Sequence, residues 1–299
     1  MADGSQPPRP RLLLDSPSLL YRAFFALPVS IRDPQGQSVN AVRGYLDMVS
    51  NIMREHRPAQ VVHVFDADWR PAFRVAAYAG YKADRRPDPP ELPPQLDMLL
   101  EVLEATQMPV ASAPGYEADD AIGTLAARAT ADDPVEIVSG DRDLMQLVRD
   151  PAVVMLFIVK GVKDLHRYDE SAVRERFGIP PRLYADFATL RGDPSDGLPG
   201  VAGVGAKTAA TLLTRYGSLD ALIAATDTSP RLRESLRVQS DYLQAMRTVV
   251  PVCLDAPVTI TEPGSPDHER LAELSQRHAL RGSIDRLEAA MAEIASPAR

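Results

Sequence analysis

Acidic side chains occupy a small set of special positions in this 299-residue sequence. They follow short apolar runs, open a helix-like segment, or lie in a turn rich in glycine and proline. So many carboxylates on neighbouring edges of a scaffold would repel one another strongly unless cations lay between them. Hard divalent cations prefer such oxygen ligands, and a pair of these ions can drive in-line displacement at a phosphate. The acids are Asp15, Asp66, Glu117, Asp119, Asp120, Asp141, Asp143, Asp193 and Asp196.

The apolar runs that precede several of these acids predict buried strands. They are short and rich in β-branched residues, and segments with helical periodicity lie between them. This alternation predicts an α/β fold with a mostly parallel sheet, in which functional groups gather beyond the carboxyl ends of the strands. One Asp at such a junction is often only a turn cap, but three junctions favour a shared site. The predicted strands cover residues 12–14, 61–65, 135–138 and 153–159.

Residues 117–120 (Glu-Ala-Asp-Asp) open an apolar helix. Acids in a first turn also stabilise the helix dipole, so a purely structural role remains open. On an ideal helix Glu117 and Asp120 share a face, whereas Asp119 lies well around from Glu117. Convergence of all three acids would therefore require an irregular first turn, which Gly115 allows.

The overall charge is a poor guide to the partner. The 33 Lys and Arg residues against 41 Asp and Glu residues give a net charge of −8, which by itself argues against nucleic acid. However, bound metal ions would cancel much of this charge. A local basic cluster could also contact nucleic acid, although a solvated helix face would explain it as well. The cluster consists of Arg70, Arg74, Lys82, Arg85 and Arg86.

Several classes of protein are excluded by composition. The single Cys253 allows no disulfide framework, and five scattered histidines match no zinc motif. No apolar run approaches the roughly 20 residues that span a membrane. The polar, proline-rich start is unlike a secretion signal. We therefore expect a cytoplasmic protein without membrane contact.

The pattern along the chain predicts three parts. Residues 1–10 are expected to form a flexible tail, 11–168 an α/β domain and 169–299 a mainly helical domain. Between 87 and 94, five prolines in eight residues exclude a regular helix and indicate a mobile crossing segment. The predicted helices cover 39–56, 95–106, 170–177, 181–190, 206–216, 219–225, 231–250 and 269–294.

A glycine-rich stretch follows the last two acids. The amides of Gly203, Gly205 and the following helix start could hold a phosphate. It is not a P-loop, because Ala206 displaces Lys207, and not a dinucleotide fingerprint, because Thr208 occupies the last glycine position. A helix-hairpin-helix at about 190–216, gripping the DNA backbone, fits best.

Six short strings of the sequence form a recognisable set. They are Leu-Leu-Leu-Asp (12–15), Val-Phe-Asp-Ala-Asp (64–68), Phe-Arg through Tyr-Lys-Ala-Asp-Arg (73–85), Gly-Tyr-Glu-Ala-Asp-Asp (115–120), Ser-Gly-Asp-Arg-Asp (139–143) and the stretch 190–209. Together these strings resemble the bacterial 5′-nuclease family, which includes the 5′-nuclease domain of DNA polymerase I and free-standing flap endonucleases. The resemblance spans about residues 11 to 251, and we expect a free-standing enzyme.

The resemblance implies a PIN-like nuclease domain with flanking helices and a helical arch, and a C-terminal helical helix-hairpin-helix domain. Two or more divalent ions, Mg²⁺ or Mn²⁺, are implied. One ion would be served by Asp15, Asp66, Glu117 and Asp119, with Asp120 close by. The second would be served by Asp141, Asp143, Asp193 and Asp196, with Asp119 near both ions.

The resemblance also implies DNA contacts. Arg74, Lys82 and Arg85 match basic arch and gateway residues that hold the scissile phosphate, and Tyr21 matches an aromatic residue that stacks on a base. The hairpin would bind K⁺, with Gly203 and Gly205 lining the site. Arg70, Lys207 and Thr208 are further predicted DNA contacts.

The implied activity is metal-dependent hydrolysis of DNA at 5′ flaps and 5′ ends, in DNA replication and repair. It would leave a 5′-phosphate and a 3′-hydroxyl. We expect a monomer that acts on branched or 5′-ended DNA, with replication or repair proteins as further partners. The alternatives are a catalytically silent branched-DNA-binding factor, which would lack a motif acid although none is missing, and a PIN-type ribonuclease, which would lack the glycine-rich hairpin.

Overall fold

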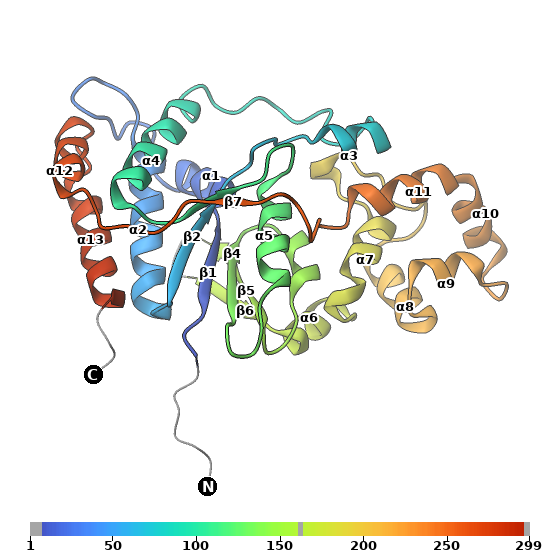
Figure 1. The fold of residues 1–299 in the computed structure, drawn as a ribbon. Helices are drawn as coiled ribbons and strands as arrows, with labels where there is room; N and C mark the ends of the chain where they lie inside the picture. Colours follow the sequence, from blue (N-terminus) through green and yellow to red (C-terminus); the bar gives the residue numbers. More distant parts are fainter. Residues whose placement is uncertain (1–7, 161–163, 296–299) are drawn as a thin grey trace, which may run out of the picture.

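The computed structural model describes residues 8–160 and 164–295, and this part of the chain is built on one seven-stranded sheet (Figure 1). The strand order is β6-β5-β4-β1-β2-β3-β7. The inner strands run parallel, and the edge strands β6 and β7 are antiparallel to their neighbours. The strands are β1 (Arg11–Asp15), β2 (Gln60–Val64), β3 (Val110–Ser112), β4 (Val135–Ser139), β5 (Val153–Lys160), β6 (Asp164–Tyr168) and β7 (Thr259–Ile260).

The inner part of the sheet is covered on both faces, which explains the apolar runs of its inner strands. On β1, Leu13 packs on one side, whereas Leu12 and Leu14 pack on the other. Helices α1 (Ser16–Ala26), α2 (Asn40–His56) and α4 (Pro93–Thr106) cover the face of Leu12 and Leu14. Helix α5 (Ala118–Ala127), the 3₁₀ turn η1 (Asp143–Leu147) and α6 (Glu170–Phe177) cover the opposite face. The predicted mostly parallel α/β sheet with flanking helices is confirmed.

The segment between β2 and α4 is mostly irregular. It contains α3 (Ala72–Ala77), and turns follow it up to residue 92. The predicted break over 87–94 overlaps the start of α4, because Pro93 and Pro94 occupy its first turn, where no backbone N–H is needed. Of the predicted tail, residues 1–7 lie outside the described residues. Within the described ranges, no helix combines the length and the apolar character that crossing a membrane requires.

The chain after β6 is helical, as predicted, but two predicted helices are broken. The helix predicted over 231–250 is interrupted at Gln239, and the one over 269–294 at Ala279, which has a left-handed φ of 52°. The elements are η2 (Pro181–Leu183), α7 (Tyr184–Arg191), η3 (Pro194–Asp196), α8 (Ala206–Tyr216), α9 (Leu219–Ala224), α10 (Pro230–Val238), α11 (Ser240–Val249), α12 (His268–Arg277) and α13 (Arg281–Ala295).

The prediction of one separate domain over 169–299 is wrong at its C-terminal end. Strand β7 pairs with β3, helix α12 packs on α4, and α13 packs on α2 (Figure 1). The apolar side chains of α13, such as Ile284 and Leu287, are buried in the same cluster as those of α2. The chain therefore leaves the α/β domain after α6, forms the helices α7–α11, and returns to the sheet.

Candidate active site

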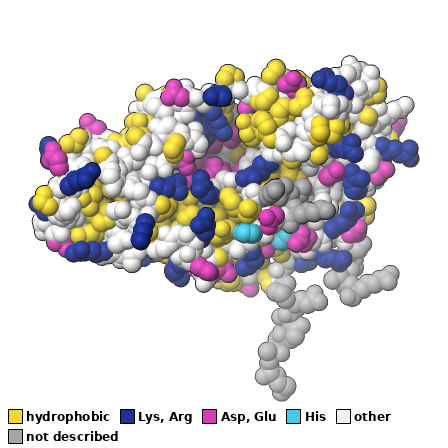
Figure 2. All heavy atoms as spheres, turned by 180° about the vertical axis from the view of Figure 1, so that it is seen from behind, with side chains coloured by type: hydrophobic (Ala, Val, Ile, Leu, Met, Phe, Trp, Pro, Cys, Tyr) yellow, Lys and Arg dark blue, Asp and Glu magenta, His cyan; other side chains and the backbone are white. Residues whose placement is uncertain are grey.

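The ends of three parallel strands bring acids to one edge of the sheet. Asp15 ends β1 opposite Val64, the last residue of β2, and Asp66 follows two residues later. Strand β4 ends at Ser139, two residues before Asp141. Because the strand ends are level, these carboxylates lie at a common edge. Figure 2 shows a hollow with acidic side chains in its depth and basic side chains at its rim.

Asp15 is buried where β1 passes into α1, and it is hydrogen-bonded from two sides. It accepts from the N–H of Ser18 at 3.3 Å and from the hydroxyl of Ser139. Burial raises the pKa of Asp15 to about 7; the Ser139 hydrogen bond opposes this rise, and the charges of Asp141 and Asp66 add to it. Ser139 was not predicted as a site residue, although its place at the strand end beside Asp141 was an available signal.

Helix α5 contributes Glu117 and Asp119 without an irregular turn, contrary to the sequence expectation. The helix begins at Ala118, and Glu117 precedes it in extended conformation, with φ −83° and ψ 165°. Desolvation raises the pKa of Asp119 well above its usual value, and the charges of Asp141 and Asp15 raise it further. Glu117 and Asp119 therefore reach one site from either side of the helix start.

A second group of acids surrounds Asp143 at the start of η1. Desolvation and the charges of Asp141, Asp193 and Asp196 raise the pKa of Asp143 well above its usual value. Its Oδ1 atom is buried and has no hydrogen-bond partner. Desolvation likewise raises the pKa of Asp196 to about 6, against the positive charge of Lys82. Asp141 acts on both groups, so the two groups adjoin.

The donor set fits hard divalent cations, but the side chains must move to bind them. Among the described residues, no three acidic, histidine or cysteine side chains are arranged to hold a metal ion directly. Glu117 faces Lys82 and Arg74, and Asp193 pairs with Arg191 at 3.3 Å. The unpaired Asp143 oxygen and the raised carboxylate pKa values nevertheless mark a site short of positive charge.

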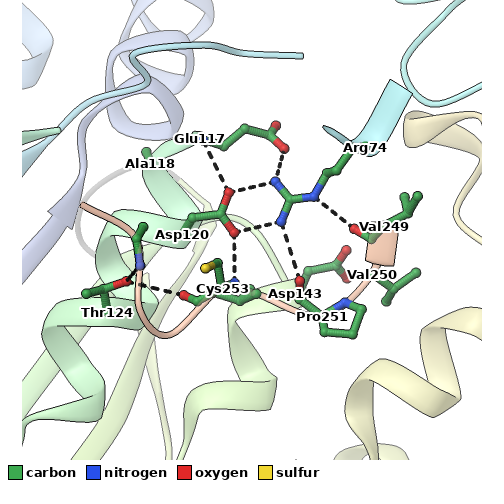
Figure 3. A network of polar contacts seen from close by, with 12 residues as sticks. Arg74, Glu117, Ala118, Asp120, Thr124, Asp143, Val249, Val250, Pro251 and Cys253 are labelled. Carbon is green, nitrogen blue, oxygen red and sulfur yellow. Dashed lines mark hydrogen bonds and ion pairs between the residues drawn. The ribbon is translucent and has the colours of Figure 1, made fainter. Parts of the chain in front are cut away.

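Arg74 and Asp120 form a buried ion pair behind the site, which corrects both predictions (Figure 3). The guanidinium donates to both oxygens of Asp120 at 2.7 Å, to Glu117 Oε2 at 2.6 Å and to the carbonyl of Val249 at 3.0 Å. Asp120 Oδ1 also accepts from the N–H of Cys253 at 2.9 Å. Asp120 therefore has no free oxygen for a metal ion, and Arg74 is not exposed to a phosphate. Both restrictions arise because Asp120 lies on the buried face of α5, where Arg74 reaches it.

Lys82 lies between the two acidic groups. Its ammonium pairs with Glu117 Oε1, and its backbone N–H donates to the carbonyl of Asp196 at 2.9 Å. Burial lowers the pKa of Lys82, but the charges of Glu117 and Asp196 outweigh it and raise the pKa overall. A Cβ at Gly197 would lie 2.4 Å from the carbonyl oxygen of Gly80, so this close approach requires glycine. The turn that carries Lys82 is thus held against the loop of Asp196.

The other residues of the basic cluster differ in whether their side chains are free to contact DNA. Arg70 donates to the carbonyls of Tyr81 at 2.7 Å and Ala79 at 2.9 Å, so it braces the turn rather than facing DNA, which corrects its prediction. Tyr81, not predicted, donates to Glu117 Oε2 at 2.6 Å and helps to orient it. Arg85 is exposed.

The glycine-rich hairpin is exposed and supported from behind. Gly203 has a left-handed φ of 81°, and Gly205 precedes α8. Lys207 and Thr208 are exposed in the first turn of α8. Gln239, at the break between α10 and α11, accepts from Ala202 N–H at 2.7 Å and donates to the carbonyl of Gly200 at 2.8 Å. The helix break that sequence periodicity missed therefore supports the hairpin.

The raised pKa values predict how stability depends on pH and metal. Asp15 and Asp196 keep their protons in the folded protein up to about 7 and about 6, whereas unfolded Asp loses them near 3.8. The metal-free protein should therefore lose stability as pH rises from about 4 to about 7. Mg²⁺, which binds the ionised carboxylates, should raise the melting temperature more near pH 8 than near pH 5. Thermal melts with Mg²⁺ or EDTA test this, and equal shifts at both pH values would contradict it.

Comparison with known proteins gives consistent matches. Residues 10–178 match the family model "5′-3′ exonuclease, N-terminal resolvase-like domain", and 179–276 match "5′-3′ exonuclease, C-terminal SAM fold". A 5′-3′ exonuclease of Mycobacterium tuberculosis is 45% identical over 94% of this chain and 98% of its own length. DNA polymerase I of the same organism is 42% identical over 89% of this chain and 29% of its length. The bacteriophage T5 D15 flap endonuclease, solved with DNA and metal ions, has a TM-score of 0.64 at 17% identity, covering 96% of this chain and 99% of the phage chain.

Proposed function

The chain belongs to the 5′-3′ exonuclease family and is a structure-specific 5′ nuclease, and we propose that its acidic edge hydrolyses DNA phosphodiesters with divalent metal ions. The resemblance stated from the sequence is confirmed. The observation that carries the proposal is the set of desolvated, mutually repelling carboxylates at this edge of the sheet, such as Asp15, Asp119 and Asp143. The T5 flap endonuclease, which shares the fold, was solved with DNA and metal ions.

Eight acids would hold the ions in two groups that adjoin at Asp141. Bound there, Mg²⁺ or Mn²⁺ would activate water and offset the charge that develops on the phosphate. To bind a metal ion, Glu117 must give up its ion pair with Lys82. The Lys82 ammonium would then be available to the substrate phosphate. The proposed groups are Asp15, Asp66, Glu117 and Asp119 for one ion, and Asp141, Asp143, Asp193 and Asp196 for the other.

The substrate would be branched or 5′-ended DNA. Exposed Arg85 would join Lys82 at the scissile phosphate, Tyr21 would stack on a base, and the hairpin residues Lys207 and Thr208 would hold the duplex backbone. We also propose K⁺ at the carbonyls near Gly203 and Gly205. A groove of about 740 Å³ supports the backbone contact, and its basic lining residues are Arg142, Arg176, Arg191, Lys207 and Arg215.

The remaining proposals concern setting and product. The enzyme would act as a monomer on nucleoid DNA in the cytoplasm, alongside replication or repair proteins, and leave a 5′-phosphate and a 3′-hydroxyl. A catalytically silent DNA-binding factor is not favoured, because every motif acid is present and the chain is 45% identical to a 5′-3′ exonuclease. A PIN-type ribonuclease is not favoured, because the chain carries the glycine-rich hairpin.

The function is tested with a 5′-labelled DNA flap on a nicked duplex. With Mg²⁺ or Mn²⁺, we expect cuts at the junction or within about one nucleotide of it, and none with EDTA. A matched RNA flap separates deoxyribonuclease from ribonuclease activity, and DNA should be preferred. Tight DNA binding without cleavage in either metal would instead support the silent binding factor.

A further inference from the structure

Strongly exposed aromatic side chains are concentrated beside the acidic edge. Among the residues that the structure describes, they are Tyr21, Phe25 and Trp69, with 47%, 62% and 50% of their surface exposed. Tyr21 and Phe25 lie on α1, which begins directly after Asp15, and Trp69 follows Asp66 by three residues. Leaving large apolar rings in water forgoes the free energy of burial, and a clustered exposure indicates a binding surface.

Phe25 and Tyr21 form a supported pair of rings. They lie four residues apart on one face of α1, with ring centroids 4.8 Å apart and planes inclined by 57°. Buried Phe24 supports the Phe25 ring edge-on at 5.2 Å. Phe25 nevertheless remains the more exposed ring of the pair. At the rise of an α-helix it lies about 15 Å along α1 from Asp15.

Helix α1 is anchored to the acidic edge, so the ring pair is held at a defined distance from it. Arg22, between the two aromatic residues in sequence, donates to the carbonyl of Gly140 at 3.2 Å. The guanidinium leaves no room for a Cβ at Gly140, which directly precedes Asp141. The anchor therefore connects α1 with the end of β4 as well as with the end of β1.

We propose that Phe25 is a second base-stacking residue beside Tyr21, and that it receives an unpaired base of the strand that is cut. The proposal rests on the proposed nuclease function. Unpaired bases present free faces that stack on aromatic side chains. Bases within a duplex are covered by their neighbours and stay nearly parallel, whereas two rings inclined by 57° can be followed only by a strand whose bases can turn. The ring pair thus fits two successive unpaired nucleotides.

The test compares Phe25→Ala with wild type on two substrates in EDTA, a nicked duplex with a 5′ flap and the same duplex without the flap. Removing the ring should raise the dissociation constant for the flap substrate about tenfold and leave that for the nicked duplex unchanged. With 2-aminopurine at successive flap positions, wild type should quench the fluorescence of one or two positions near the junction. Phe25→Ala should lose this quenching at one of them, and Phe25→Trp should retain it.

Leu254→Ala is the matched control. Leu254 is 54% exposed but lies beside Ala126 and Ala127, at the end of α5 that is far from the acidic edge. Removing its side chain should therefore leave the dissociation constants for both substrates unchanged. Circular dichroism and melting temperature verify that the variants fold. Three results for Phe25→Ala would overturn the proposal: equally weakened binding of both substrates, unchanged 2-aminopurine quenching, or a change only in self-association measured by light scattering. If wild type cleaves the flap while Phe25→Ala behaves like wild type, only this inference fails, whereas a wild type without cleavage refutes the nuclease function itself.

Discussion

Replacing Asp15 by asparagine should abolish cleavage of a 5′-flap substrate while the protein stays folded and still binds DNA. Asp15 is the buried acid at the end of the central strand β1, and burial together with Asp141 and Asp66 raises its pKa to about 7. Asparagine keeps the size and one oxygen acceptor for Ser139 but removes the charge that would attract a metal ion. We expect kcat/KM to fall by about a thousandfold or more.

The metal-free Asp15→Asn protein should also be more stable than wild type at neutral pH, because a repelled charge is removed. Loss of activity combined with a higher melting temperature in EDTA separates a functional role from a folding role. Asp141→Asn should lose cleavage similarly. Asp68→Asn is the matched control and should remain active, since among the described residues the Asp68 side chain accepts a hydrogen bond only from the N–H of Arg70. Full activity of Asp15→Asn would refute its assignment as a metal ligand.

Replacing Arg74 by methionine should have the largest effect on stability. The change leaves Asp120 and Glu117 buried without their shared cation, and losing one partner of a buried ion pair costs about 3–5 kcal/mol. Glu117 also loses the contact that orients it beside Lys82. We expect cleavage to fall about 10- to 100-fold and to need more metal ion for half-maximal rate. Urea unfolding and a metal titration of the cleavage rate measure the two effects.

The double variant Arg74→Met/Asp120→Asn distinguishes structure from direct phosphate contact. It removes both charges of the bidentate pair, so much of the lost stability should return. A direct phosphate contact by Arg74 would predict unchanged stability in the single variant and a rise in KM for DNA. A single variant as stable as wild type would therefore contradict the buried network.

Local patterns predicted the scaffold well. The apolar runs at 12–14, 61–65, 135–138 and 153–159 are all strands of the sheet, because β-branched, near-continuous apolar sequence suits only strands covered on both faces. The acids directly after these runs were placed at one edge by the same reasoning, since parallel strands end together. The glycine-rich turn before α8 was also identified by its composition.

Most of the predictions that failed depended on partners distant in sequence. Asp120 and Arg74 are residue types that could bind a metal ion or a phosphate, and only the packing of α3 against α5 and α11 turns them toward each other. The sequence shows the apolar face of α13, but it does not show that this face packs on α2. Glutamine is compatible with a helix, so the sequence does not reveal that α10 ends before Gln239 and that the Gln239 side chain is hydrogen-bonded to the hairpin.

The sequence by itself determined the strand ends, the acids that follow them and the membership of the nuclease family, because each rests on short strings of neighbouring residues. The tertiary structure alone decided which of the acids remain free. Folding pairs Asp120 with Arg74, whereas Asp143 keeps a buried oxygen without a partner. The reason is energetic: desolvation and pairing of a charge depend on everything that packs around it, and those neighbours come from all parts of the chain.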